Sequence, residues 1–195
     1  MNKYYPIEQH LLQNFPDNPD LIADLLSKKQ LVHFSKNEIV LTQGEVSNKL
    51  YFLEKGALMQ QYVEGKQTRA SQFHFEGELV TSFESFESRN VSEHNIICLE
   101  DCTLQEFHYE DVRKFHISYD EMNLKKTNNF LKMFLDYREL HSKLLSYSSE
   151  KMYNYILTNH PNIILRVPLK YVAEYMGISG EHLSRVRKAV STTKG

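Results

Sequence analysis

Hydrophobic and polar residues alternate along the middle of the chain, from Leu31 to His116. The alternation comes in short runs rich in β-branched and aromatic residues, and turn residues separate the runs. Short strands about ten residues apart favour an antiparallel sandwich or barrel. The predicted strands are residues 31–34, 38–41, 49–54, 57–64, 69–75, 78–83, 95–100 and 103–109. Before them, residues 7–31 carry the pattern of two short amphipathic helices, broken at Pro16–Asp20.

A helical pattern returns from about Tyr119 to Ser146, with apolar residues on two sides. One side is spaced alternately by four and three residues, which is typical of a coiled-coil seam. This seam consists of Phe130, Phe134, Tyr137, His141 and Leu144. A helix with two apolar sides needs two partners, so we expect the β-domain on one side and a second copy of the chain on the other. Burial within a single chain is the alternative. Ser148 or Ser149 can cap a further helix that ends at residues 159–161.

Two more helices are predicted between Val167 and Ala189. Pro168 suits the first turn of the first helix, and Gly177 can end that helix in the left-handed conformation. Ser179 can cap the second helix by accepting a backbone N–H. This order is typical of a helix-turn-helix. The alternative is an ordinary helical hairpin with a charged, solvated face.

The second of these helices carries side chains suited to DNA. Glu181 and Arg185 are four residues apart and therefore share one face. Arginine can form a bidentate bond with guanine and glutamate can accept from cytosine, whereas arginine and lysine also hold phosphates. We expect Arg187, Lys188 and Ser184 on phosphate, and His182 in either role. The predicted DNA-binding set is Ser179, Gly180, Glu181, His182, Ser184, Arg185, Arg187 and Lys188.

The charge distribution supports a nucleic-acid partner at this end of the chain. From Arg166 onward there are six lysines and arginines against two glutamates, a net +4 in a chain whose total is −2. A basic end on an acidic body is typical of nucleic-acid contact confined to one module. The chain has no apolar run of about 18 residues and no secretory signal pattern, so we expect no membrane contact and a cytoplasmic location.

Catalytic and metal sites are not indicated. Cys98 and Cys102 are too few for a zinc or iron–sulfur site, and the nine histidines show no metal-binding spacing. Haem would need an axial histidine, and the pattern singles none out. The chain has no P-loop, G-x-S-x-G or G-x-G-x-x-G motif. We therefore expect no enzyme activity, no metal and no cofactor.

Glycines at predicted turns lead to a family resemblance. They lie in LTQGEVSNKLYFLEKGAL, VEGKQ and FHFEGELVTSF, and Glu181, Ser184 and Arg185 form E-x-x-S-R near the end. In this order the chain resembles the Crp–Fnr superfamily of bacterial regulators over nearly its whole length. It looks most like the short Crp-like regulators common in Bacteroidetes genomes.

The resemblance implies an α+β fold in which a double-stranded β-helix, or jelly roll, is followed by a long dimerisation helix and a helix-turn-helix. The expected domains are 1–116 for the roll with its N-terminal helices, 117–146 for the dimerisation helix, and 147–195 for DNA binding. It implies a homodimeric transcription regulator that binds a palindromic duplex and works with RNA polymerase. The alternative is a dimeric sensing or interaction module whose helix-turn-helix no longer reads DNA. A third interpretation is compatible with both alternatives: the roll binds an effector, and this effector sets the geometry of the helices.

The resemblance also implies an effector pocket, in which a helix-opening Gly-Glu and a later Arg-Ser hold a cyclic nucleotide. Gly77 and Glu78 match the first pair, but Ser92 and Glu93 stand where Arg-Ser would be. Because Glu93 would repel a phosphate, we expect no tight binding of cyclic AMP or cyclic GMP. The pocket is expected to hold another small molecule or to be filled by aromatic side chains, which are Tyr62, Phe73, Phe75, Phe83 and Phe86.

Overall fold

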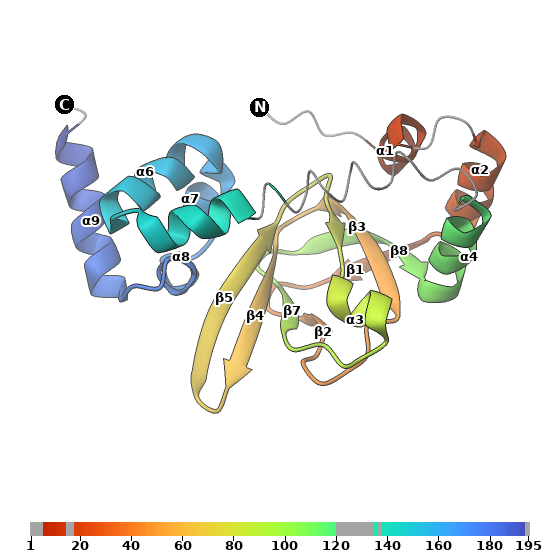
Figure 1. Cartoon of the computed structure of the whole chain (residues 1–195), viewed down its shortest axis with the longest axis horizontal. Coiled ribbons are helices and arrows are strands. Elements are labelled where there is room, and N and C mark those ends of the chain that lie inside the picture. Colours follow the sequence, from red (N-terminus) through yellow and green to blue (C-terminus); the bar gives the residue numbers. More distant parts are fainter. Residues whose placement is uncertain (1–5, 15–17, 120–134, 136–137, 194–195) are drawn as a thin grey trace.

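The computed structural model describes residues 6–14, 18–119, 135 and 138–193 of the chain. Two four-stranded sheets form the middle of the molecule, in the orders β1-β8-β3-β6 and β2-β7-β4-β5 (Figure 1). The strand pairs within both sheets are antiparallel. The strands are β1 Gln30–Phe34, β2 Ile39–Leu41, β3 Lys49–Lys55, β4 Leu58–Glu64, β5 Gln67–His74, β6 Leu79–Val80, β7 Asn95–Cys98 and β8 Cys102–His108. This arrangement confirms the predicted jelly-roll type of sheet domain, called the roll below.

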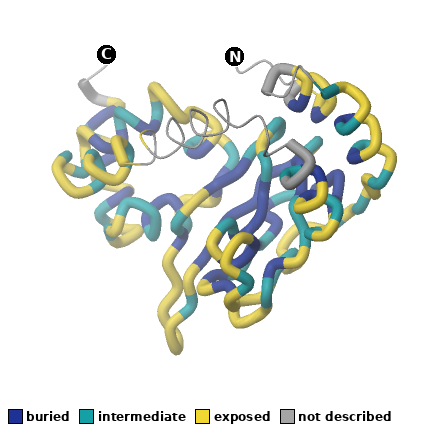
Figure 2. Tube along the Cα trace, turned by 45° about the vertical axis from the view of Figure 1, so that its right-hand side comes forward, coloured by how far each residue is buried: buried dark blue, intermediate teal, exposed yellow. Residues whose placement is uncertain are grey.

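Alternate residues of the strands point their side chains into the space between the two sheets and fill it. Apolar side chains from both sheets point inward and are almost completely buried. Figure 2 draws much of the strands in dark blue, the colour of buried residues. The inner cluster consists of Tyr51, Leu53, Leu58, Val80, Ile96, Cys98, Cys102 and Leu104. Cys98 and Cys102 are free thiols within it.

Helices cover the outer face of the first sheet. They are α1 Ile7–Asn14, α2 Pro19–Ser27 and α4 Tyr109–Tyr119. Their apolar sides pack on Phe52 and Phe107, which point outward from the sheet. The two N-terminal helices were predicted from the sequence, and the structure confirms both.

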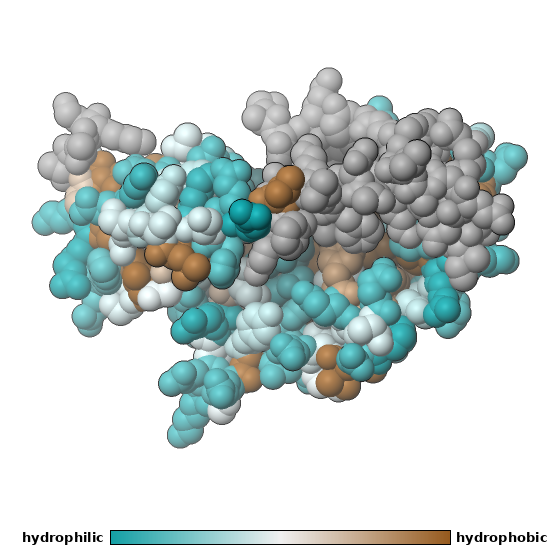
Figure 3. All heavy atoms as spheres, viewed as in Figure 1, coloured by the Kyte–Doolittle hydropathy of each residue, from teal (hydrophilic) through white to brown (hydrophobic). Residues whose placement is uncertain are grey.

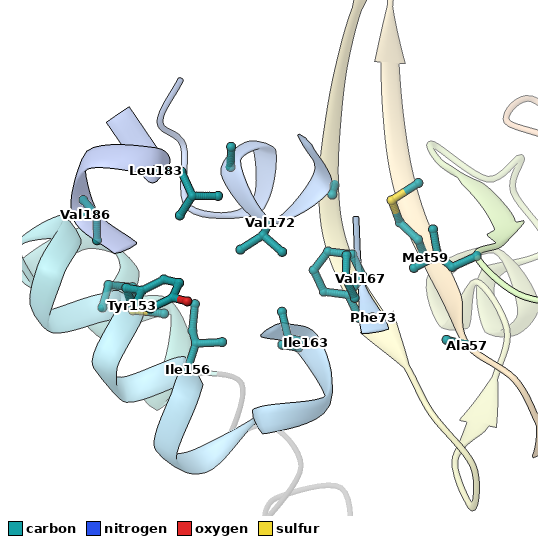
Figure 4. Packing of buried hydrophobic residues seen from close by; sticks show 14 of the residues in the cluster. Ala57, Met59, Phe73, Tyr153, Ile156, Ile163, Val167, Val172, Leu183 and Val186 are labelled. Atoms are coloured by element: carbon teal, nitrogen blue, oxygen red, sulfur yellow. The ribbon is translucent and has the colours of Figure 1, made fainter. Parts of the chain in front are cut away.

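The C-terminal helices cover the outer face of the second sheet. They are α6 Ser149–Asn159, α7 Pro161–Arg166, α8 Leu169–Tyr175 and α9 Gly180–Thr193. Met59 and Phe73 of the sheet, and Ala57 just before β4, share one apolar cluster with these four helices (Figure 4). The roll and the C-terminal helices therefore share a core, which we call the joint cluster.

Several predictions need correction in detail. Residues 78–83 are a strand only at Leu79–Val80, and α3 then runs over Phe83–Ser88. The short helix α7 was not predicted, although Pro161 at its start is a helix-opening signal. Pro168 lies at the N-cap of α8, so the helix begins one residue later than expected.

Part of the expected dimerisation helix lies outside the described residues. This applies to Phe130, Phe134 and Tyr137 of the predicted seam. Residues 138–146 are helical; there His141 is exposed, and Leu144 is half-buried against the joint cluster. No helix in the described ranges has the length and the apolar character needed to cross a membrane.

Candidate functional site

The turn between α8 and α9 has the geometry that its glycine predicts. Gly177 has φ +67°, in the left-handed region. Its N–H donates to the Glu174 carbonyl over 3.1 Å, and the Ile178 N–H donates to the Ala173 carbonyl over 3.0 Å. These bonds close the end of α8. A Cβ atom at Gly177 would meet nothing within 4 Å, so the backbone conformation, not lack of space, favours glycine here.

Ser179 caps α9 as predicted. Its Oγ accepts a hydrogen bond from the His182 N–H over 3.1 Å, and its carbonyl accepts from the Leu183 N–H over 2.9 Å. A serine hydroxyl in this position satisfies a backbone N–H that the helix itself leaves unpaired. The direction of α9 relative to α8 is therefore fixed locally.

One side of α9 is buried against the other C-terminal helices. Leu183, Val186 and Val190 belong to the joint cluster, and Leu183 is only 1% exposed. Figure 4 shows Leu183 and Val186 facing Tyr153 and Val172. The spacing of three and four residues is the helical period that the sequence shows. This packing fixes which residues of α9 face solvent.

The opposite side of α9 carries the predicted DNA-binding residues. Glu181, Ser184, Arg185, Arg187 and Lys188 are exposed, as are Ser179 and Gly180, and His182 is half-buried. The ion pairs between helix positions i and i+4 of the described residues are Asp24–Lys28, Glu139–Lys143 and Lys170–Glu174. Glu181 and Arg185 are not among them, so they share a face without binding each other. Both are available to an external partner.

The predicted effector residues lie at two different turns. Gly77, with φ +90°, forms the turn before β6, and its N–H donates to the Leu53 carbonyl over 2.9 Å. The Glu78 carboxylate is exposed and lies 3.2 Å from Nδ1 of His74. These two residues do not open a helix, because β6 intervenes; α3 opens after Ser82.

Ser92 and Glu93 differ in burial and in hydrogen bonding. Ser92 is buried, and its hydroxyl donates to the His94 carbonyl over 2.8 Å, whereas Glu93 is exposed. The Ser92 N–H donates to the Glu45 carbonyl over 2.7 Å. Both hydrogen-bond donors of Ser92 are therefore occupied inside the protein.

Arg89 is the arginine closest in sequence to this turn, and it points elsewhere. Its guanidinium donates to the Ser47 carbonyl over 2.8 Å and to Asn48 Oδ1. It also lies 3.8 Å from the centre of the Tyr109 ring. These contacts hold the guanidinium of Arg89 at Ser47, Asn48 and Tyr109, the first residue of α4.

Polar residues inside the roll were not predicted. Gln60 Nε2 lies 3.2 Å from His74 Nε2 and 3.2 Å from the Thr81 carbonyl, to which it donates. His94 is 4% exposed, and its Nε2 has no hydrogen-bond partner among the described residues. Burial lowers the pKa of His94. Strand alternation could have placed Gln60 and His74 inside, since Met59 and Phe73 face outward.

The aromatic residues do not fill the roll as one set. Phe73 packs outward, with its ring centre 5.3 Å from that of Tyr175 on α8, and Phe75 also contacts the joint cluster. Phe86 packs on the helices that cover the other sheet. The expectation that these three rings fill the pocket is therefore wrong, because Phe73 and Phe75 contact the joint cluster and Phe86, in α3, packs on the helices of the other sheet. The roll instead has a cavity of about 200 Å³ lined by Val40, Ser47, Lys49, Tyr51, Thr81 and Ile96.

In the described part of the chain no cluster of histidine, cysteine or acidic residues could hold a metal ion.

Comparison with known protein families shows which domain the sequence of the roll resembles. Residues 31–119 match the sequence model of the cyclic nucleotide-binding domain. A search of curated protein sequences finds no significant match to the chain.

Known structures extend the likeness beyond the roll. The c-di-GMP responsive global regulator CLP of Xanthomonas campestris has a TM-score of 0.66 and 18% identity, with coverage of 89% of this chain and 92% of that chain. FixK2 from Bradyrhizobium japonicum has a TM-score of 0.70 and 16% identity, with coverage of 85% and 86%. The catabolite activator protein of Thermus thermophilus has a TM-score of 0.52 and 20% identity, with coverage of 90% and 84%. These neighbours are Crp–Fnr regulators, and at such identities the likeness shows the fold.

Proposed function

We propose that the protein is a homodimeric transcription regulator of the Crp–Fnr type that binds a palindromic DNA site through α8 and α9. The observation that carries the proposal is the two-sided character of α9. Leu183 and Val186 anchor it, and Glu181 and Arg185 share an exposed face without pairing with each other. A helix held this way can enter the major groove as a rigid unit.

We assign separate roles to the residues of α9. Arg185 and Glu181 would contact base edges, because their side chains can form directional bonds with guanine and cytosine. Ser184, Arg187 and Lys188 would contact phosphates, which position the helix without reading sequence. Ser179, Gly180 and His182 lie at the start of α9, where the chain comes near the duplex. Gly180 contributes no side chain, so base contacts are expected mainly from the next turn.

Dimerisation would bring two copies of α9 to one face of the duplex. Symmetric helix-turn-helix dimers bind half-sites about 34 Å apart, which is one turn of DNA. The predicted seam between Phe130 and Leu144 would form this dimer. Leu135 and Leu145 lie on the second apolar side of this predicted helix, beside the seam, and are 49% and 76% exposed, so that side also offers apolar surface to a partner. RNA polymerase would be the further partner, in the cytoplasm.

We propose the division of labour that the sequence indicated, with a sensing roll in 1–116, a dimerisation helix in 117–146 and a DNA-binding part in 147–195. The roll is proposed not to respond to cyclic AMP. The hydroxyl of Ser92 donates its hydrogen bond to a carbonyl of the protein, and the guanidinium of Arg89 is hydrogen-bonded to Ser47 and Asn48. A cyclic phosphate would therefore find no cation at the position where the resemblance predicts one.

Selection from a random duplex pool tests the proposal. The protein should be incubated with the pool at fixed salt, because phosphate affinity varies steeply with ionic strength. We expect enrichment of a two-fold-symmetric sequence with half-sites one helical turn apart. Retention of DNA without sequence enrichment, or no retention, would contradict sequence-specific binding and favour the sensing or interaction module.

A further inference from the structure

One arginine joins the C-terminal helices to the roll. Arg166, the last residue of α7, donates to both carboxylate oxygens of Glu76, over 2.6 Å from Nη1 and 2.7 Å from Nη2. It also donates to both oxygens of Glu100, over 3.0 Å from Nε and 2.6 Å from Nη2. The planar guanidinium group is suited to holding two carboxylates at once, which the point charge of lysine is not.

The two carboxylates come from different turns of the roll. Glu76 follows β5, and Glu100 lies in the turn between β7 and β8. Glu76 Oε1 also accepts the N–H of Gly56, in the turn between β3 and β4, over 2.9 Å. Arg166 therefore connects α7 to three turns at the same end of the roll. We call Arg166, Glu76 and Glu100 the triad.

A second polar contact lies on α8, next to α9 in the chain. The Glu174 carboxylate accepts from Thr68 Oγ1 over 3.1 Å, from the Ala70 N–H over 3.2 Å and from Gln61 Nε2 over 3.3 Å. These partners belong to β4 and β5. The helices before α9 are thus held to the roll at two points, by the triad and by Glu174.

Polar contacts add direction to the apolar contact between the roll and these helices. The joint cluster stabilises their contact, but apolar attraction is not directional. The charged hydrogen bonds of the triad have definite directions, and its side chains are shielded, with Arg166 24% exposed, Glu76 28% and Glu100 36%. Screening by salt is therefore weaker than for an open surface pair.

We propose that the triad fixes the angle of α8 and α9 on the roll, which makes Arg166 a positioning residue for DNA binding. The inference rests on the proposed function. A dimer must place two copies of α9 one helical turn apart, so an error in this angle is repeated at both half-sites. Arg166 acts through α7 and α8 and touches no base.

A distance measurement tests the positioning role without DNA. Spin labels at Lys66→Cys on the β4–β5 turn and Thr158→Cys on α6 report the placement of the helices, because the native thiols are buried. Labelled chains are diluted into unlabelled protein so that distances within one chain dominate. Arg166→Met keeps a long side chain and removes the bonds, whereas Arg69→Met removes one exposed charge of the roll.

We expect one narrow distance distribution for the wild type and for Arg69→Met. Arg166→Met should broaden or shift it in the folded protein, and Arg166→Lys should lie between them. Circular dichroism at the same temperature confirms that each variant is folded. An unchanged distribution for folded Arg166→Met would overturn the positioning role, even if that variant is less stable. If Arg166→Met fails to fold, Glu100→Gln replaces it, with the same expectation.

The DNA readout separates positioning from base contact. Arg166→Met should lower the affinity for the complete palindrome about fivefold or more, within the usual range of coupling between sites, and leave the affinity for a single half-site nearly unchanged. Equal losses on both DNAs would contradict positioning. If the wild type selects no site, the proposed function fails, and the distance measurement still decides whether the triad fixes the angle.

Discussion

Replacing Gly56 with alanine should be far more destabilising than the same change at another turn of the roll. Gly56 has φ +105°, which L-residues rarely adopt, and an added Cβ atom would lie 2.7 Å from Sγ of Cys102 and 2.8 Å from the carbonyl oxygen of Asp101. Gly44 has φ +91° but open space around the same position. The pair therefore separates the cost of backbone conformation from the cost of overlap.

The expected magnitudes follow from these two terms. An unfavourable φ costs about 1–3 kcal/mol, and this should be the whole effect of Gly44→Ala. Overlap with packed atoms adds about 1–3 kcal/mol, so Gly56→Ala should lose about 2–6 kcal/mol of the free energy of unfolding. Natural domains have only about 5–15 kcal/mol in total, and Gly56→Ala should therefore be marginal at room temperature.

Urea unfolding followed by circular dichroism measures both variants. The slope of free energy against urea must stay the same, so that the midpoint reports stability. We expect Gly56→Ala to have a clearly lower midpoint than Gly44→Ala. Equal midpoints would show that the turn between β3 and β4 can move away from Cys102. The close approach of Gly56 to Cys102 would then make no contribution to the free energy of unfolding.

Three further predictions concern the N-cap of α9, the loss of stability at acid pH and the binding of cyclic nucleotides. Ser179→Ala removes the hydrogen bond to the His182 N–H and should cost about 1 kcal/mol in urea unfolding; no loss would show that the cap is replaced by water. Burial alone would raise the pKa of Glu76, but hydrogen bonds from Arg166 and Gly56 hold it below its ordinary value of 4.5. Its contribution to stability is therefore present above pH 4.5 and is lost as the pH falls through the lower, folded-state pKa, so the urea midpoint of the wild type should drop in that range more than that of Glu76→Gln. Calorimetry with cyclic AMP or cyclic GMP should show no micromolar binding, and heat of binding in that range would overturn the account of Ser92 and Arg89.

Local patterns in the sequence predicted what local physics determines. Alternation and turn glycines located the strands, and Gly177 with Ser179 predicted the turn and the start of α9, because each signal acts within a few residues. On the face that Figure 3 shows, most of the coloured surface is hydrophilic. The buried side of α9 followed from the helical period.

Features that depend on distant contacts were not predictable. The triad joins residues 66 and 90 positions apart, and no pattern in the sequence links them. The Gly-Glu match was attractive as a motif, but the two-residue strand β6 separates Gly77 and Glu78 from α3. The buried His94 could not be distinguished from a surface histidine, since it lies in the bend before β7, where no strand alternation applies.

The most direct test of the central claim compares Arg185→Ala with Arg187→Ala on the selected palindrome and on its single-base variants. Arg185→Ala should cost about 1–3 kcal/mol and relax specificity at one base pair in each half-site. Arg187→Ala should weaken binding to all sequences alike and reduce the salt dependence by about one unit. If Arg185→Ala binds every variant as the wild type does, α9 does not read DNA, and the assignment of its exposed face to base contacts is wrong.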